Sequence, residues 1–282
     1  MPLTTTRELI AQAATDGVGL AALNVLHVET AEAIAAGAEA AGRGAVLQIS
    51  ENCVRFHGGL APIAAAAAAV AEASSAPLSL HLDHAQDPAL ATEALRLGFS
   101  SVMIDAATLP WEENVALTRR VVAEGHAAGA VVEAEIGEIG GKDGAHAPGV
   151  RTDPDEAARF AEATGVDLLA VAVGSSHAMT ERTAALDLDL VRAIAAVVPV
   201  PLVLHGSSGV PDDLLVRAVA AGMRKINIST QLNKVFTAAV RARLDDDPAL
   251  VDSRKYLGAG RTAMAGEVER LVRLLASTGV DR

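Results

Sequence analysis

The sequence predicts an α/β protein that folds as a single (β/α)₈ (TIM) barrel domain over residues 1–282, and three observations lead to this prediction. Eight short apolar runs alternate with longer alanine-rich segments of helical spacing, a pattern typical of parallel sheets. The length of 282 residues suits this barrel, which takes about 250 residues as one domain. No GxGxxG motif follows the first run, which disfavours the main rival, a Rossmann-like sheet.

The predicted strands are short runs of small aliphatic residues. Since they recur between helical segments along the whole chain, each is expected to pair with the next in a closed parallel sheet. In chain order they span residues 19–25, 45–50, 78–84, 101–105, 131–137, 168–174, 202–206 and 225–230.

The intervening segments predict helices, among them residues 29–41, 88–97, 112–128, 155–163 and one that begins near Pro211. The apolar run 60–71 is too short for a membrane span and contains Pro62, so we expect a buried alanine-rich helix there. Residues 140–154 predict a long loop, and such a loop inside a compact domain is usually functional or mobile. A C-terminal helical tail follows Pro248 and includes an amphipathic helix over 262–275.

The overall charge argues against a nucleic-acid-binding protein. The net charge is −12 and no run of Lys or Arg is present, whereas nucleic-acid binders usually carry a basic stripe. An anionic substrate is still compatible with this charge, because backbone N–H groups and a few cations hold phosphate locally. A single cysteine, Cys53, excludes an intrachain disulfide, and residues 1–10 lack the apolar core of a signal peptide. We therefore expect a cytoplasmic protein with no membrane span.

Polar residues stand at the predicted C-terminal end of each strand, which is where barrel enzymes assemble their active sites. A single polar residue at such a place is more often a cap for the next helix. A polar residue at each of eight strand ends instead indicates an active site. These residues are Asn24, Ser50, Asp83 with His84, Asp105, Glu135, His177, His205, and Asn227 with Ser229 and Thr230.

Three histidines at these strand ends, His84, His177 and His205, suit a zinc site. Neutral imidazole is a good zinc ligand, and three protein ligands leave a fourth position open for substrate, as in catalytic zinc sites. His81 is expected to support the core or the surroundings of the metal. The other histidines are expected on the surface or in loops: His27, His57, His126 and His146.

A Gly- and Ser-rich turn over residues 205–209 precedes the helix near Pro211 and predicts a phosphate site. Backbone N–H groups in such a turn cradle phosphate. The loop that contains Asn227, Ser229 and Thr230 is its expected neighbour, and phosphate sites in barrels commonly use the loops after strands seven and eight.

Five motifs stand at or near the predicted strand ends: HLDH at 81–84, SVMID at 101–105, VEAEIG at 132–137 followed by Gly140 and Gly141, LVLHG at 202–206 and KIN at 225–227. Taken together, they resemble those of the class II ketose-bisphosphate aldolases, which include the fructose- and tagatose-bisphosphate enzymes. The likeness runs from about Asn24 to Met264 in the same order and spacing. It implies a (β/α)₈ barrel, a catalytic Zn²⁺, and reversible cleavage of a ketose (bis)phosphate to dihydroxyacetone phosphate and an aldehyde through a metal-stabilised enediolate.

The resemblance also implies roles for individual positions. His84, His177 and His205 match the zinc ligands, and Asp83 matches the residue that exchanges a proton with the substrate oxygen. Asp105 and Glu135 match carboxylates near the metal, sometimes part of a second divalent or monovalent cation site. The expected substrate contacts are Asn24, Ser50, Gly206, Ser208, Asn227, Ser229 and Thr230.

These roles agree with the chemistry of the reaction. Cleavage of a C–C bond beside a ketone leaves an enediolate, and zinc as a Lewis acid takes up the developing charge. The 4-hydroxyl of the ketose must lose a proton, which Asp83 is placed to exchange. No Schiff base is needed, and Lys225, which begins the last predicted strand, is expected at the wrong end of the barrel to form one.

Several positions depart from the family pattern. The loop glutamate that moves the carbon-bound proton falls at Asp143, and a lysine that faces the ketose phosphate falls at Glu181. A carboxylate beside a phosphate is repulsive, so either the substrate lacks that phosphate or another cation has replaced the lysine. We predict Arg182 as the replacement, because a guanidinium binds phosphate with two donors. The alternative is a solvent-exposed arginine paired with Glu181 or Asp187.

Two other functions are compatible with parts of this pattern. A metal-dependent barrel hydrolase would use zinc to activate water, but it often shows a His-x-His pair at the end of strand one, where this chain has Asn24. A non-catalytic barrel subunit of a partner aldolase would have no reason to keep Asp83 with three zinc-matching histidines. We expect a phosphorylated sugar as the substrate and a homodimer or homotetramer. The sequence leaves open which ketose is cleaved.

Overall fold

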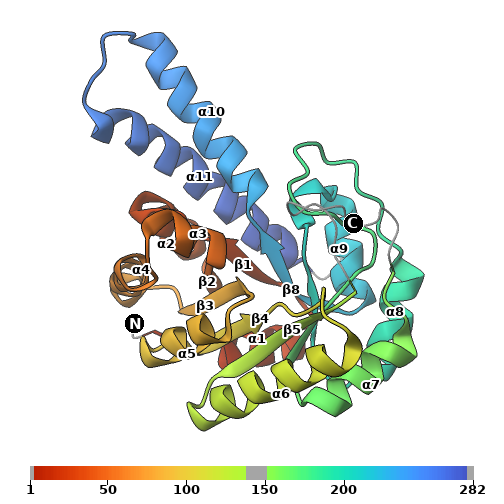
Figure 1. Ribbon diagram of the computed structural model, residues 1–282. Helices are drawn as coiled ribbons and strands as arrows, with labels where there is room; N and C mark the ends of the chain where they lie inside the picture. Colours follow the sequence, from red (N-terminus) through yellow and green to blue (C-terminus); the bar gives the residue numbers. More distant parts are fainter. Residues whose placement is uncertain (1–2, 138–150, 278–282) are drawn as a thin grey trace.

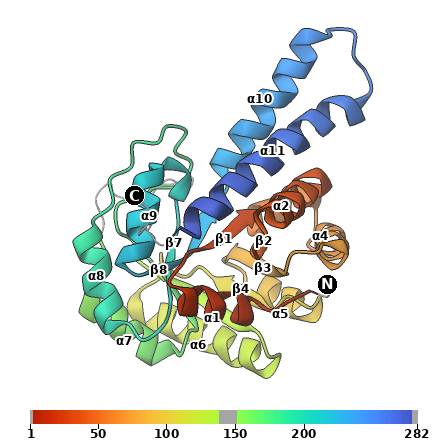
Figure 2. The same ribbon diagram turned by 180° about the vertical axis from the view of Figure 1, so that it is seen from behind.

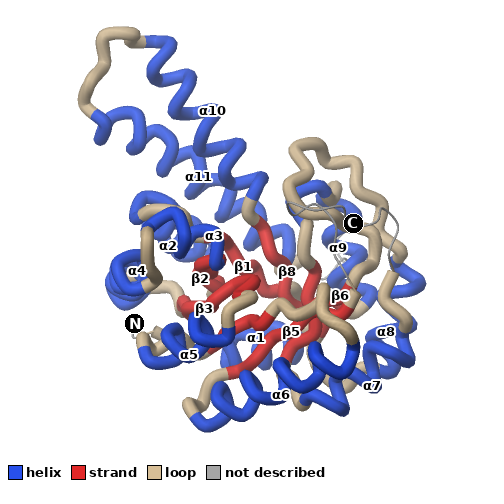
Figure 3. The backbone as a smooth tube through the Cα atoms, viewed as in Figure 1, coloured by secondary structure: helices blue, strands red, loops and turns tan. Residues whose placement is uncertain are grey.

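The computed structural model describes residues 3–137 and 151–277. Eight parallel strands form a closed barrel in chain order, with β8 pairing with β1, and helices surround it (Figures 1 and 3). The predicted (β/α)₈ barrel is therefore confirmed. The strands are β1 (Leu20–Asn24), β2 (Ala45–Ser50), β3 (Leu78–Ala85), β4 (Ser101–Ile104), β5 (Val131–Ile136), β6 (Leu168–Val171), β7 (Leu202–Leu204) and β8 (Met223–Ile228).

Helices α2 to α9 connect consecutive strands and form the outer layer of the barrel, whereas α1 precedes the first strand and α10 and α11 follow the last (Figure 1). They are α1 (Thr6–Asp16), α2 (Val28–Ala41), α3 (Glu51–His57), α4 (Ala61–Ala73), α5 (Pro88–Arg96), α6 (Trp111–Ala127), α7 (Pro154–Thr164), α8 (Leu188–Val197), α9 (Asp212–Ala221), α10 (Thr230–Asp246) and α11 (Ser253–Leu275), with a short 3₁₀ turn η1 (Ser207–Gly209).

Most predicted elements end within a few residues of the observed ones, and the differences have local causes. β6 and β7 stop at Val171 and Leu204, before the turns that carry the site. α11 begins at Ser253, nine residues earlier than the amphipathic segment predicted from 262, and the Asp252 side chain caps its first turn by accepting from Arg254 N. Most of the loop predicted over 140–154 lies outside the described residues.

Helix α1 was not predicted, although its start has a clear sequence signal. Thr5 and Glu8 form a capping box, in which each side chain accepts a hydrogen bond from the backbone N–H of the other residue. Leu9 and Ile10 of this helix pack against residues at the first positions of the strands, such as Leu20 and Leu168. The helix therefore covers the N-terminal end of the barrel, seen from behind in Figure 2, and leaves the opposite end for the site.

The interior of the barrel is filled by small side chains, including Ala22, Val46, Ala170 and Val203. Small residues suit this position because side chains from eight strands converge on the axis. The layer nearest the C-terminal ends is different. There the buried residues are polar or charged, among them His81, Glu133 and Lys225, and they lie beneath the cavity described below.

Helices α10 and α11 lie side by side and project away from the barrel (Figures 1 and 2). Where they leave it, Gly260 is needed for close packing, because a Cβ there would lie 2.9 Å from the ring of Phe236. Among the described residues no single helix is long and apolar enough to cross a membrane, and α3 with α4 reach that length only across a bend of 112°.

Candidate active site

A cavity of about 640 Å³ opens at the C-terminal ends of the strands. Nearly all of the sequence-predicted site residues line it, although they come from different strands and are up to 206 positions apart in the chain. The predicted residues that line it are Asn24, Ser50, Asp83, His84, Asp105, Glu135, His177, His205, Gly206, Ser208, Asn227, Ser229 and Thr230. Asp143 and His146 lie outside the described residues.

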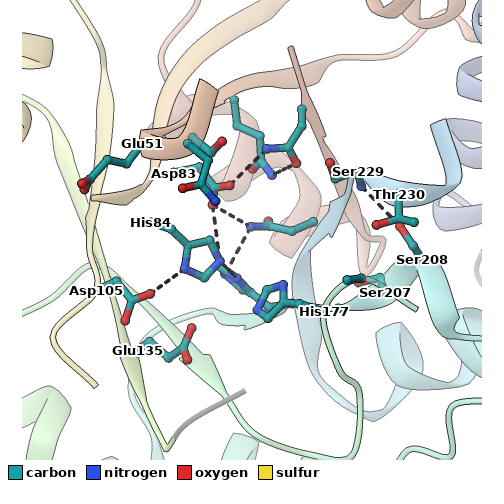
Figure 4. Close-up of a pocket in the computed structure, with 18 of the residues that line it drawn as sticks. Glu51, Asp83, His84, Asp105, Glu135, His177, Ser207, Ser208, Ser229 and Thr230 are labelled. Atoms are coloured by element: carbon teal, nitrogen blue, oxygen red, sulfur yellow. Dashed lines mark hydrogen bonds and ion pairs between the residues drawn. The ribbon is translucent and has the colours of Figure 1, made fainter. Parts of the chain in front are cut away.

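His84 reaches the cavity because the backbone of β3 departs from regular strand geometry. Alternation along a strand points Asp83 inward and would point His84 away from the barrel axis. The pairing of β3 with β4 shifts register between Leu82 and Ala85, and His84 has a φ of 50°, which is uncommon for a residue with a Cβ. The irregularity re-aims the imidazole, so that Asp83 and His84 both face the cavity (Figure 4).

Four side chains at the floor of this cavity could hold a metal ion. One ligand atom from each of His84, Glu135, His177 and His205 lies within 4.8 Å of the others. The imidazole rings of His84 and His205 have centroids 4.5 Å apart, and those of His84 and His177 lie 5.0 Å apart. Three imidazoles with one carboxylate suit a transition metal such as zinc.

Hydrogen bonds to two carboxylates prepare two of these histidines as ligands. Asp105 accepts from His84 Nδ1 at 2.8 Å, and Glu133 accepts from His205 Nε2 at 2.9 Å. Each carboxylate therefore fixes the tautomer that leaves the other ring nitrogen as a lone pair. Those two nitrogens, His84 Nε2 and His205 Nδ1, lie 2.7 Å apart. Two facing lone pairs repel each other, so the arrangement fits a cation that both nitrogens bind.

Asp105, expected from the sequence as a carboxylate near the metal or in a second cation site, lies outside the group of four ligand atoms. One of its oxygens is used by His84 instead. Residues on loops that follow different strands meet only in the folded barrel, so the sequence alone could not separate a ligand from the carboxylate that orients it.

Asp83 is 4% exposed and is held by two amides. Asn24 Nδ2 donates to one carboxylate oxygen at 3.1 Å, and Asn227 Nδ2 donates to the other at 3.4 Å. Gln48 in turn donates to Asn24 Oδ1 at 2.7 Å. Gln48 lines the cavity but was not singled out from the sequence, because it stands two residues before the strand end at Ser50.

Beneath the histidines, two fully buried charged residues that the sequence did not point to, Lys225 and Glu133, join His81, which was expected to support the core or the surroundings of the metal. Lys225, Glu133 and His81 each have 0% exposure, and Lys225 Nζ lies 2.8 Å from Glu133 Oε2. The expectation that Lys225 lies at the wrong end of its strand overlooked the length of its side chain, which reaches up to Asn227 Oδ1 at 2.8 Å. The position of Lys225 in the KIN motif at 225–227 was the sequence feature that could have identified it as part of the site.

The same surroundings move the pKa values of these groups. Burial lowers the pKa of His81 to about 3, and the charge of Lys225 acts in the same direction. Burial and the neighbouring His84 lower the pKa of His205 to about 4. Burial alone would raise the pKa of Glu133, but Lys225 and His205 outweigh it and hold that pKa well below its ordinary value. Neutral imidazole is the form that binds a metal.

The far side of the cavity is formed by the turn after β7 and the start of α10. Gly206 has a φ of 66°, and a Cβ there would lie 2.6 Å from the Ser176 backbone, so only glycine fits. Ser208 Oγ accepts from Gln231 N at 3.1 Å and lies 3.4 Å from Ser229 N. Figure 4 shows Ser208 and Thr230 together on one side of the histidines. A helix start with Ser and Thr hydroxyls favours an anionic group.

Arg182 does not line this cavity. Its guanidinium donates to the Val210 carbonyl at 2.9 and 2.6 Å and pairs with Asp212 at 2.5 Å. Neither the predicted phosphate contact nor the predicted pairing with Glu181 or Asp187 describes this geometry. The loop that carries Arg182 turns the side chain toward α9, and Glu181 beside it is exposed.

Across the cavity from Ser208 lies the start of α3, where Glu51 is nearly buried (Figure 4). Glu51 accepts from Gln86 N at 2.6 Å and pairs with Arg55 on the same helix. Among the described residues that line the cavity, Arg55 is the only lysine or arginine. Neither residue was predicted from the sequence, since both follow the strand rather than end it.

Comparison with known proteins adds to this geometry. A family model described as fructose-bisphosphate aldolase class-II matches residues 4–280. The chain is 37% identical to a fructose-bisphosphate aldolase of Thermus caldophilus, with 98% of this chain and 99% of that protein covered. It is 33% identical to a 6-phospho-5-dehydro-2-deoxy-D-gluconate aldolase of Bacillus licheniformis, with 99% and 97% covered.

A solved structure shows the same similarity in three dimensions. The crystal structure of the YdjI aldolase from Escherichia coli K12 superimposes with a TM-score of 0.83 at 28% identity, and the match covers 99% of this chain and 100% of that one. The barrel, the projecting helices and the site therefore belong to one continuous region of similarity.

Proposed function

This chain belongs to the class II fructose-bisphosphate aldolase family, and from this premise we propose that it uses zinc to cleave a phosphorylated ketose reversibly into dihydroxyacetone phosphate and an aldehyde. The family makes the chain an aldolase, a carbon–carbon lyase. The choice of zinc as the metal, the substrate and the residue roles are our proposal.

The observation that carries the proposal is the placement of Asp83 beside the histidine cluster in one cavity. An aldolase of this type needs positive charge at the ketone and a proton carrier at the neighbouring hydroxyl. His84, His177 and His205, with Glu135, would hold the metal. Asp83 Oδ1 lies 3.9 Å from His84 Nε2, so both requirements meet within one substrate's length.

When bound, the metal would act as a Lewis acid that stabilises the negative charge of the enediolate. The chain's own residues handle the protons and the orientation. Asp83 takes the proton of the 4-hydroxyl during cleavage and returns it during condensation. Asn24 and Asn227 hold its two carboxylate oxygens, so the carboxylate has one orientation toward the substrate.

We propose that the ketose phosphate lies at the Ser208 side of the cavity. The backbone of residues 206–208, the Ser208 and Ser229 hydroxyls and Thr230 at the start of the 17-residue helix α10 supply neutral donors there. Ser50 and Asn24 would contact the ketose itself. Asp143, which we propose moves the carbon-bound proton, lies outside the described residues.

The proposal extends to the state of the protein in the cell. We propose a cytoplasmic homodimer or homotetramer with no nucleic-acid partner. The α10–α11 pair supports self-association, because it projects from the barrel (Figure 1) with Leu244 and Leu257 only half-buried and Val251 91% exposed. Sedimentation equilibrium measures the subunit number directly, and a monomer at micromolar concentration would contradict this part.

A screen of retro-aldol cleavage tests the proposed activity. The purified protein, stripped of metal and reloaded with Zn²⁺, is offered phosphorylated and free ketoses, and dihydroxyacetone phosphate is measured with a coupled enzyme. We expect cleavage of a phosphorylated ketose that disappears with chelator and returns with Zn²⁺. Activity in excess chelator, or a borohydride-trapped lysine adduct, contradicts the zinc assignment. Absence of stoichiometric metal would favour a non-catalytic subunit, and hydrolysis without aldol cleavage would favour a hydrolase.

A further inference from the structure

Lys225 lies at a branch point beneath the active site. It is fully buried, and its Nζ contacts two acceptors, Glu133 Oε2 at 2.8 Å and Asn227 Oδ1 at 2.8 Å. One of these residues leads to the proposed metal ligand His205, and the other leads to the proton carrier Asp83. No step of the proposed reaction uses Lys225, although burying an ammonium group is costly unless it is paired.

The first branch sets the direction of a hydrogen bond to the metal ligand. Lys225 occupies Glu133 Oε2, which leaves Oε1 aimed at His205 Nε2, 2.9 Å away. A carboxylate oxygen only accepts, so Nε2 must carry the proton. The lone pair then lies on Nδ1, the nitrogen that faces His84.

The second branch sets the orientation of an amide. The Lys225 ammonium has donors only, so the carbonyl oxygen of Asn227 must face it. The amide nitrogen of Asn227 then turns the other way and donates to Asp83 Oδ1 at 3.4 Å. One buried cation therefore determines which end of Asn227 faces the cavity.

Glu133 and Asn227 both approach the same nitrogen of His205. Its Nε2 lies 2.9 Å from the Glu133 carboxylate and 3.1 Å from Asn227 Nδ2. A hydrogen bond to the Glu133 carboxylate requires that Nε2 carries the proton. A hydrogen bond from the Asn227 amide would require an unprotonated Nε2. The ring proton would then lie on Nδ1, and Nδ1 could not bind the metal. A charge-assisted bond is stronger than a neutral one, but only while the carboxylate stays aimed at the ring.

We propose that Lys225 is a positioning residue that aims both Glu133 and Asn227, and so fixes His205 in its metal-binding tautomer. The inference deepens the proposed function, on which it rests for the identity of the metal site. The effect of Lys225 is measured as the affinity of the protein for Zn²⁺, which does not require aldol cleavage. A failure of this inference is therefore distinguishable from a failure of the proposed activity.

Three variants test the direction of the hydrogen bonds by competition of the metal-free protein with a chromogenic Zn²⁺ chelator. Lys225→Met should weaken Zn²⁺ binding by about 10–100-fold, the usual effect of losing a residue that orients a ligand. Glu133→Gln should weaken it more strongly, because Lys225 would take the new carbonyl and turn the NH₂ group toward His205. The double variant Lys225→Met/Glu133→Gln should bind Zn²⁺ about tenfold more tightly than Glu133→Gln alone, since the freed amide turns its carbonyl to His205.

A purely structural role for Lys225 predicts the opposite sign for the double variant, because two destabilising changes in one buried cluster would add. Double-variant affinity equal to or weaker than that of Glu133→Gln, or Lys225→Met affinity within twofold of the parent, overturns the inference. Phe160→Leu in α7, a fully buried position, serves as the control for general destabilisation and should leave Zn²⁺ affinity unchanged. If Lys225→Met does not fold, Glu133→Gln and the double variant still decide the sign.

Discussion

The floor and the rim of the cavity are built on different principles. The floor consists of Asp83, His84, Glu135, His205 and Asn227, which stand at or next to strand ends. All of these except Glu135 make the side-chain hydrogen bonds described above. The rim is the segment 175–187 after β6, where Glu181 is exposed and Arg182 is held by a carbonyl and Asp212. Pairing with a strand on each side fixes the backbone position of a strand end. A side chain on the rim has no such constraint and can contact several different partners.

The difference shows that strand-borne residues keep the positions expected from their type and spacing, while a rim residue does not. His177 is the instructive exception, because it stands in the rim segment and yet meets the floor. It is followed by Ala178 with a φ of 59°, a conformation uncommon for a residue with a Cβ. The loop is therefore shaped to bring one side chain back to the floor.

The largest expected effect is the loss of the metal from the floor. His84→Ala, His177→Ala and His205→Ala should each abolish stoichiometric metal binding and reduce cleavage to the level of the chelated protein, because each removes one of the three imidazole ligands of the proposed zinc site. Metal analysis with activity assays checks this. His126→Ala is the matched control, since that histidine is partly exposed and pairs with Asp167 outside the cavity. Full activity of His177→Ala would show that the rim segment contributes no metal ligand.

Loss of the proton carrier is the next largest effect. Asp83→Ala should bind the metal normally but cleave about 10²–10⁴-fold more slowly, the usual contribution of one general acid–base group. Metal content and kcat are measured on the same sample. Asp213→Ala, an acidic residue of α9 that does not line the cavity, should keep the parent rate. A slow Asp83→Ala that also lacks metal would mean that this carboxylate supports the cluster instead.

The buried histidines of the floor make stability depend on pH. Folding holds the pKa of His81 at about 3 and that of His205 at about 4, whereas an unfolded histidine has a pKa of about 6.5. Below 6.5 the unfolded chain binds protons that the folded protein excludes. The free energy of unfolding of the metal-free protein should therefore fall as the pH falls, by up to about 1.4 kcal/mol per pH unit for each histidine.

Urea denaturation between pH 7 and pH 4.5 measures this slope. His81→Asn removes one of the two groups and should make the slope shallower by up to about 1.4 kcal/mol per pH unit. Equal slopes for the parent and the variant would show that His81 does not resist protonation in the folded protein.

The smallest expected effect belongs to the rim. Arg182→Ala should lower the free energy of unfolding by about 1 kcal/mol through loss of a partly exposed ion pair and its hydrogen bonds. The ratio of the KM values for a phosphorylated and a free ketose should stay the same. Arg192→Ala, an exposed arginine paired with Asp189, is the control. A KM that rises tenfold for the phosphorylated ketose alone would restore Arg182 as a phosphate contact and break the distinction between floor and rim.

The sequence by itself determined the barrel and most of the lining of the cavity. Alternation of apolar runs with helical segments is a local property, and parallel strands bring their C-terminal ends to one face whatever the details of packing. Polar residues such as Asn24 and His205 at those ends were therefore predictable as neighbours without knowledge of any contact.

Only the tertiary structure decided which atom of each residue faces which partner. The left-handed backbone at His84, the reach of Lys225 up to Asn227 and the capture of Arg182 by Asp212 all depend on residues that are distant in the chain. Hydrogen bonds and ion pairs are short-ranged and directional, so a difference of a few ångströms selects the partner. Sequence periodicity places a residue on a face of the barrel, but it does not resolve distances of that size.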